Sequence, residues 1–200
     1  TDEEGRTVRL GDYFRGDRPV VINLAYYACP MLCTLVLNGV VESANQLDWT
    51  LGEQFENVTV SIDPSETSAL AKAKKENYLH TYKRAGAADH WHFLVGRQEN
   101  ITRLAEAAGF GYRYDPKQKQ FIHTAITMVV TPDGRLSRYL YGIEYQPQTL
   151  RLALLEAGEG KIGNTIDKLV LYCYHYDPTA GRYSPVAMRV MQVGGGLTAG

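Results

Sequence analysis

The sequence predicts an α/β fold in which a central sheet is flanked by helices on both faces. Three strand patterns are each followed by a helical pattern, at residues 20–47, 57–82 and 92–108. Such alternation is typical of a largely parallel sheet, because a helix carries the chain back between parallel strands. A hairpin pattern at residues 125–141 then adds two antiparallel strands, so the predicted sheet is mixed.

Length and composition limit the class of protein. The 200 residues are 44% hydrophobic and 22% charged, which suits one globular domain with a sizeable core. The net charge is -1 with no basic block, so nucleic acid is not an expected partner. No apolar run reaches the roughly 18 residues that span a bilayer. Because the chain starts at Thr1 without an initiator Met, we expect a processed or trimmed soluble piece, associated with a membrane only through a segment absent from it.

The first strand leads into a turn that carries two cysteines. An apolar, β-branched run that begins at Val20 breaks at Cys29-Pro30, and a helical pattern then continues to about Leu47. Cys29 then lies at the helix N-terminus, and Cys33 follows one turn later on the same face. The helix dipole and its free N–H groups predict lowered thiol pKa values there. Thiolates bind metal or attack disulfides, and the Cys-x-x-x-Cys spacing does not choose between the two.

The remaining elements follow in order. Thr7–Leu10 alternates in polarity before a Gly-Asp turn and suggests a small edge strand. Asp63 follows the second strand and is expected to turn the chain and cap the next helix, with Ser65 and Thr67 as the other candidate caps. The third strand is expected at His92–Val95, and the helix after it at Asn100–Ala108, ending at Gly109. Residues 112–119 are predicted to form a polar loop.

A change in the sequence pattern separates a domain from a C-terminal extension. After the hairpin, an amphipathic helix at Gln148–Glu159 completes a domain placed at residues 1–160. Residues 161–200 are expected to form a Tyr-rich extension, packed on the domain or trailing from it, with a flexible Gly-rich end. Within it, Cys173 is expected to be a buried thiol. The alternative is that Tyr172–Tyr176 forms a recognition surface for a partner.

Three motifs in order resemble one known family. They are Tyr27-Ala28-Cys29-Pro30-Met31-Leu32-Cys33, then Ser61-Ile62-Asp63-Pro64, and then Phe121-Ile122-His123-Thr124 ahead of Val130-Thr131-Pro132-Asp133-Gly134. Together with the order of elements, they resemble the Sco/SenC family from Val8 to about Leu155. The resemblance implies a thioredoxin-like fold and a membrane-tethered copper protein that helps deliver copper to the CuA site of cytochrome c oxidase. It also implies a place in the bacterial periplasm or an equivalent extracytoplasmic space.

The same resemblance implies copper ligands at Cys29, Cys33 and His123. Two residues depart from the family pattern: Ile122 precedes the histidine, where Asp is common, and Glu66 stands as the second acid of the Asp-Pro segment. The residue chemistry supports the site independently, because two thiolates and an imidazole suit Cu(I) and also hold Cu(II). Three protein ligands leave one coordination position open, through which an acceptor can attack the metal before the donor releases it.

Two functions would use the same cysteines. The first is a copper metallochaperone, not an enzyme, that passes one copper ion to an apo CuA subunit of cytochrome c oxidase or to another copper chaperone. The alternative is a thiol:disulfide oxidoreductase that reduces the acceptor's cysteines, with Cys29 and Cys33 as its redox pair. His123 discriminates between them, because only the copper site needs it. A peroxidase-like enzyme is disfavoured, since no Arg lies in the cysteine turn. The other histidines have no comparable support: His80, His90, His92 and His175.

Overall fold

The computed structural model describes residues 1–29, 32–162, 176–177 and 182–183. The chain separates into two compact units, Thr1–Ile162 and Gly163–Gly200, and each is described by itself. In the second unit, β8 (Tyr176–Asp177) pairs antiparallel with β9 (Arg182–Tyr183). Cys173, most of the Tyr-rich run and the Gly-rich end lie outside the described residues. The predictions made for them, and the predicted division into a domain and an extension, therefore stay predictions.

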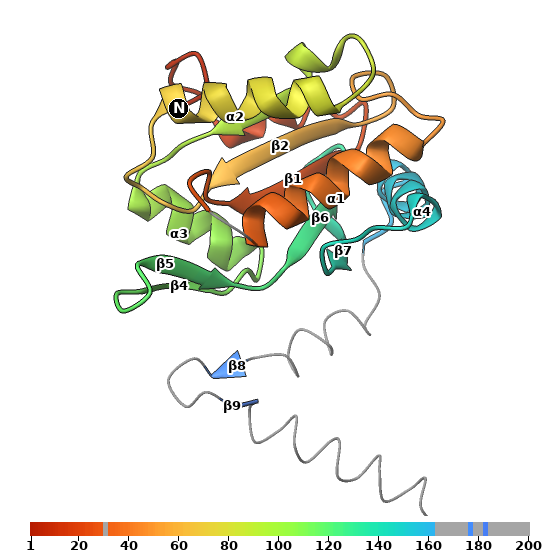
Figure 1. The fold of residues 1–200 in the computed structure, drawn as a ribbon. Helices are drawn as coiled ribbons and strands as arrows, with labels where there is room; N and C mark the ends of the chain where they lie inside the picture. The colour runs from red at the N-terminus through yellow and green to blue at the C-terminus, as the bar shows by residue number, and fades with distance from the viewer. Residues whose placement is uncertain (30–31, 163–175, 178–181, 184–200) are drawn as a thin grey trace, which may run out of the picture. The chain divides into compact units, whose positions relative to one another are not determined.

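A five-stranded mixed sheet forms the centre of the first unit (Figure 1). Its strand order is β3-β2-β1-β6-β7. The first three strands of the chain run parallel, β6 runs antiparallel to β1, and β7 runs antiparallel to β6. The predicted mixed sheet is therefore confirmed. Its strands are β1 (Val20–Ala25), β2 (Glu56–Ser61), β3 (Trp91–Leu94), β6 (Ile126–Val130) and β7 (Leu136–Tyr141).

Four α-helices lie within the described part of the first unit. α1 and α4 pack against each other and against β6, while α2 packs along β3 (Figure 1). None of the helices among the described residues is long and apolar enough to cross a membrane. Each helix follows a strand or hairpin that the sequence predicted. The helices are α1 (Leu32–Gln46), α2 (Ser68–Thr81), α3 (Gln98–Ala107) and α4 (Pro147–Gly158).

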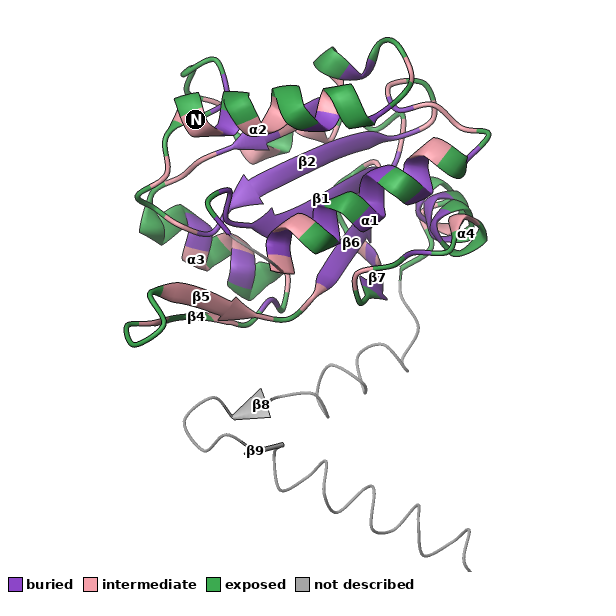
Figure 2. Cartoon of the chain, in the orientation of Figure 1, coloured by how far each residue is buried: buried purple, intermediate pink, exposed green. Residues whose placement is uncertain are grey.

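The inner strands are buried on both faces. β1, β2 and β6 are buried along their whole length (Figure 2). Polar side chains within them are paired, as buried polar groups must be. Asn23 Nδ2 donates to Asn57 Oδ1 at 2.9 Å, and Thr127 Oγ1 donates to Asn23 Oδ1 at 2.9 Å. Because these strands are buried, we look for accessible reactive side chains in the loops at the strand ends.

Two predicted elements are wrong. Residues 7–9 form no strand, and the 3-10 turn η1 (Leu10–Tyr13) follows them, because the Asp12 carboxylate accepts a hydrogen bond from the Arg9 N–H at 3.1 Å. The predicted polar loop at 112–119 belongs instead to a hairpin, which forms a two-stranded sheet apart from the central one. Cross-strand pairing stabilises this hairpin in spite of its polar composition. Its strands are β4 (Tyr112–Asp115) and β5 (Gln120–His123).

Asp63 turns the chain as predicted, but it does not cap α2. Its Oδ1 accepts hydrogen bonds from the N–H and the hydroxyl of Ser65, at 2.8 and 2.6 Å. The cap is Thr67, whose Oγ1 accepts from the Leu70 N–H at 3.4 Å. Asp63 lies too early in the chain to reach the first turn of the helix. It closes the loop between β2 and α2 instead.

Candidate metal centre

The two cysteines lie where β1 gives way to α1, at the carboxyl end of the parallel strands. Cys29 closes the loop after β1 and is 7% exposed, whereas Cys33 lies in the first turn of α1 and is 1% exposed. No disulfide joins them. The Cys33 N–H donates to Cys29 Sγ at 3.3 Å, and the Tyr26 N–H donates to Cys33 Sγ at 3.4 Å. Both sulfurs therefore accept backbone hydrogen bonds from within the same turn.

His123 reaches the cysteine turn from the last position of β5. Its Nε2 lies 3.0 Å from Cys33 Sγ, although the two residues are 90 positions apart in the chain. Its Nδ1 lies 2.9 Å from the Thr124 carbonyl oxygen. A carbonyl can only accept, so in the neutral ring the Nδ1 carries the proton and Nε2 presents its lone pair to the sulfur. That tautomer is the one in which Nε2 can ligate a metal.

Aromatic packing holds the β4–β5 hairpin against the cysteine turn. The rings of Tyr26 and Phe121 have centroids 5.4 Å apart, and those of Phe110 and His123 have centroids 5.5 Å apart. Within the hairpin, the rings of Tyr114 on β4 and Phe121 on β5 make an edge-on contact with centroids 5.2 Å apart. Such ring pairs contribute beyond the area they bury. The hairpin thus positions His123 through contacts that the sequence pattern did not reveal.

The prediction of a lowered thiol pKa is wrong for Cys33. Burial raises its pKa, and the nearby charges of Cys29 and Glu66 act in the same direction, while the hydrogen bond from the Tyr26 N–H opposes them. Desolvation here outweighs the helix N-terminus, because the thiolate would be almost wholly removed from water. Burial likewise lowers the pKa of His123. Near neutral pH the site therefore holds a protonated Cys33 thiol and a neutral imidazole.

Glu66 contacts the cysteine turn from the opposite loop, a role that sequence reasoning missed. Its Oε2 accepts from the Tyr27 N–H at 2.8 Å, and its Oε1 accepts from the Ala28 N–H at 2.7 Å. The Ser61 hydroxyl donates to the same carboxylate at 2.6 Å. In the sequence, Glu66 was only a departure from a family pattern. The available signal was the acid itself, placed three residues after Asp63, but a single Glu does not identify its partner.

The donor set fits a soft metal ion, although the described residues hold no preassembled shell of three ligands. Cys33 and His123 are in contact, and Cys29 Sγ lies beside the Cys33 backbone. No group of three or more His, Cys, Asp or Glu side chains in the described part of the chain is arranged to hold a metal ion. Two thiols and an imidazole are nevertheless the ligands that suit copper. The residues therefore match copper in chemistry, while their final coordination needs local adjustment.

Two other histidines, His90 and His92, have different partners. His90 Nδ1 lies 3.0 Å from Glu56 Oε1, in a loop before β3. The His92 ring packs against Tyr13 with centroids 4.4 Å apart, and burial lowers its pKa to about 4. These contacts hold the N-terminal segment and the edge of the sheet. They give neither histidine a place beside the cysteines.

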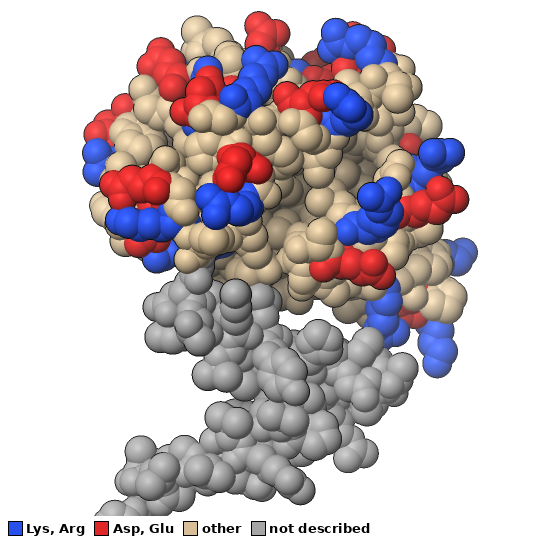
Figure 3. Space-filling model, turned by 180° about the vertical axis from the view of Figure 1, so that it is seen from behind, with Lys and Arg blue, Asp and Glu red and all other residues tan. Residues whose placement is uncertain are grey.

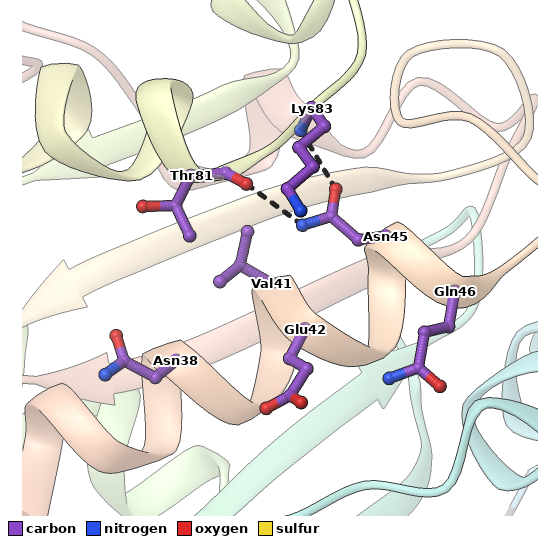
Figure 4. A pocket seen from close by; sticks show the side chains of 7 residues that line it. All are labelled: Asn38, Val41, Glu42, Asn45, Gln46, Thr81 and Lys83. Carbon is purple, nitrogen blue, oxygen red and sulfur yellow. Dashed lines mark hydrogen bonds between the residues drawn. The ribbon is translucent and has the colours of Figure 1, made fainter.

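A hollow beside α1 is a weaker candidate site. It measures about 540 Å³ and is lined by residues of α1 and by Thr81 and Lys83, which hydrogen-bond to Asn45 (Figure 4). It contains none of the three predicted ligands. On the face seen in Figure 3, acidic and basic side chains lie next to one another without a patch of one sign. Neither feature offers a chemistry comparable with that of the cysteine turn.

Comparisons with known proteins agree on one family. The family model described as SCO1/SenC matches residues 1–155. No curated protein matches the chain. Three similar solved structures are copper-bound ScoI of Arabidopsis thaliana, a SCO1/SenC family lipoprotein from Bacillus anthracis str. Ames, and BsSco, described as a cytochrome c oxidase assembly protein with a disulfide switch.

These structures share the fold at low sequence identity. The Arabidopsis protein is 15% identical with a TM-score of 0.63, over 80% of this chain and 94% of that one. The Bacillus anthracis lipoprotein is 17% identical with a TM-score of 0.60, over 78% and 91%. BsSco is 19% identical with a TM-score of 0.60, over 80% and 91%. The predicted thioredoxin-like fold is confirmed, and the chain belongs to the SCO1/SenC family.

Proposed function

We propose that this protein binds one copper ion through Cys29, Cys33 and His123 and delivers it during the assembly of cytochrome c oxidase. The observation that carries the proposal is the 3.0 Å approach of His123 Nε2 to Cys33 Sγ. This imidazole comes from a separate hairpin onto a buried cysteine, and its Nε2 presents a lone pair to Cys33 Sγ. It has a clear purpose as a third copper ligand.

The residues of the site prepare it for a metal cargo. His123 is neutral, with its Nε2 lone pair directed at Cys33, so it can ligate without losing a proton. Cys33 must lose its proton when copper binds, which couples binding to pH. Three protein ligands leave a coordination position for the acceptor. The acceptor is an apo CuA subunit or another copper chaperone, since both offer thiolate ligands that can replace those of the donor.

The location belongs to the same proposal. A related structure is described as a lipoprotein, which supports an extracytoplasmic protein held at a membrane, in the bacterial periplasm or an equivalent space. This location is tested by measuring how the full-length protein distributes between the membrane and soluble fractions of the cell.

An anaerobic titration tests the copper site. The reduced protein is titrated with Cu(I) and with Cu(II) against a chromophoric chelator, beside His123→Ala and the control His80→Ala, which alters an exposed histidine on α2. We expect one tightly bound copper per chain, a thiolate-to-copper absorption band, and a large loss of affinity in His123→Ala alone. Absence of tight copper from the wild-type protein would refute the proposal.

The second candidate function is that of a thiol:disulfide oxidoreductase. The proximity of the two cysteines favours it, because both are reduced and the Cys33 N–H donates to Cys29 Sγ at 3.3 Å within one turn of the chain. An oxidoreductase does not need His123. Disulfide exchange that is rapid in both the wild type and His123→Ala, without tight copper binding, would select this function over copper delivery.

A further inference from the structure

Glu66 joins the turn that carries the cysteines to the end of the neighbouring strand. Its two carboxylate oxygens accept hydrogen bonds from the consecutive N–H groups of Tyr27 and Ala28, at 2.8 and 2.7 Å. These are the last two residues before Cys29. One side chain therefore fixes the backbone on which the first cysteine is placed.

A short chain of hydrogen bonds holds Glu66 itself. The Asp63 N–H donates to Ser61 Oγ at 3.0 Å, and the Ser61 hydroxyl donates to Glu66 Oε2 at 2.6 Å. Ser61 is the last residue of β2 and pairs in register with Ala25, the last residue of β1. The carboxylate is thus anchored on one strand and holds the loop that leaves the adjacent strand.

Both hydrogen bonds to Glu66 have a carboxylate as acceptor. A charged acceptor makes shorter and stronger hydrogen bonds than a neutral one. Two successive backbone N–H groups that face one carboxylate restrict the peptide planes of both residues. Among the described residues, Glu66 is the acceptor of both N–H groups, so without it the turn would gain conformational freedom that copper binding would have to remove.

We propose that Glu66 is a positioning residue, which holds the Tyr27-Ala28 backbone so that Cys29 and Cys33 can bind copper together with His123. The inference rests on the proposed function and extends it to a residue that touches no ligand directly. It differs from a general stabilising role, because Glu66 acts on the geometry of the thiol pair. Changes at Glu66 should therefore alter the copper site even in a protein that remains folded.

The test compares Glu66→Gln with Glu76→Gln. Glu66→Gln keeps the size of the side chain but turns an amide N–H₂ toward one of the backbone donors. Glu76→Gln removes the same charge from an exposed position on α2. Both are examined for Cu(I) affinity by chelator competition, for the energy of the Cu(II) thiolate band, for the thiol–disulfide midpoint potential, and for thermal unfolding.

We expect Glu66→Gln to lose about 10- to 100-fold in Cu(I) affinity, as for other partners that orient metal ligands, with a shifted thiolate band and midpoint potential. Glu76→Gln should match the wild type. If Glu66→Gln binds copper like the wild type with an unchanged band, or changes only its thermal unfolding, the inference is wrong and the proposed function stands. If the wild type itself binds no copper, the proposed function fails and this inference fails with it.

Discussion

The affinity for Cu(I) should rise steeply with pH, because the metal must displace the proton of a buried thiol. Cys33 is 1% exposed, and burial raises its pKa above the usual value of a cysteine. The thiol is therefore protonated throughout the range from about pH 6.5 to about pH 8.5. Burial lowers the pKa of His123, so the imidazole is neutral over the same range and releases no proton.

The magnitude follows from counting displaced protons. Cys33 alone contributes about one tenfold increase in apparent affinity for each pH unit, or about 100-fold over two units. His123→Ala should lower the affinity at every pH without changing the slope, whereas Cys33→Ser should remove the contribution of one proton.

Chelator competition under anaerobic conditions measures this slope directly. The apparent affinity is determined at several pH values, with the chelator's own proton binding taken into account, and proton release is measured separately in weakly buffered solution. A wild-type affinity that stays constant over the range would contradict the reasoning. So would a slope that appears only below about pH 6.5, because it would assign the displaced proton to a histidine rather than to a thiol.

Three further predictions concern the scaffold. Gly39→Ala should lower the free energy of unfolding by about 1 to 3 kcal/mol in urea denaturation, because its Cβ would clash with the Ile143 carbonyl oxygen; an unchanged midpoint would contradict this contact. Between about pH 6.5 and pH 4 only the unfolded chain protonates His92, so acid lowers the free energy of unfolding of the wild type. His92→Gln should reduce this loss by about 1 to 2 kcal/mol, and a variant with the same pH dependence as the wild type would refute the prediction. Phe121→Ala should weaken copper binding by about tenfold through loss of its packing on Tyr26, measured beside Tyr141→Ala as an exposed control.

Much of the fold was predictable because its elements are long and strongly patterned. The run of β1 is short, apolar and rich in β-branched residues, which favours a buried strand, and the apolar stripe of α1 recurs at the helical period. The β4–β5 hairpin was missed because its residues are mostly polar and partly exposed. Its stability comes from pairing between Tyr114 and Phe121 across the strands, which is a tertiary property.

The candidate site was predictable only in part. The cysteine turn follows from the local sequence, whereas His123 was identified through resemblance to a family, since nothing in its neighbourhood marks a ligand. The direction of the Cys33 pKa shift depends on burial by distant segments, so a helix N-terminus alone predicted the wrong sign. Glu66 was overlooked for the same reason: its partners are backbone groups that lie 38 and 39 positions earlier in the chain.

X-ray absorption spectroscopy of the copper-loaded protein tests the central claim most directly. The wild-type protein, loaded with one Cu(I) per chain, should show a first shell of two sulfur scatterers and one nitrogen scatterer. His123→Ala should lose the nitrogen and keep both sulfurs. A wild-type shell made only of sulfur, or a spectrum that His123→Ala leaves unchanged, would show that Cys29, Cys33 and His123 do not form the copper site together.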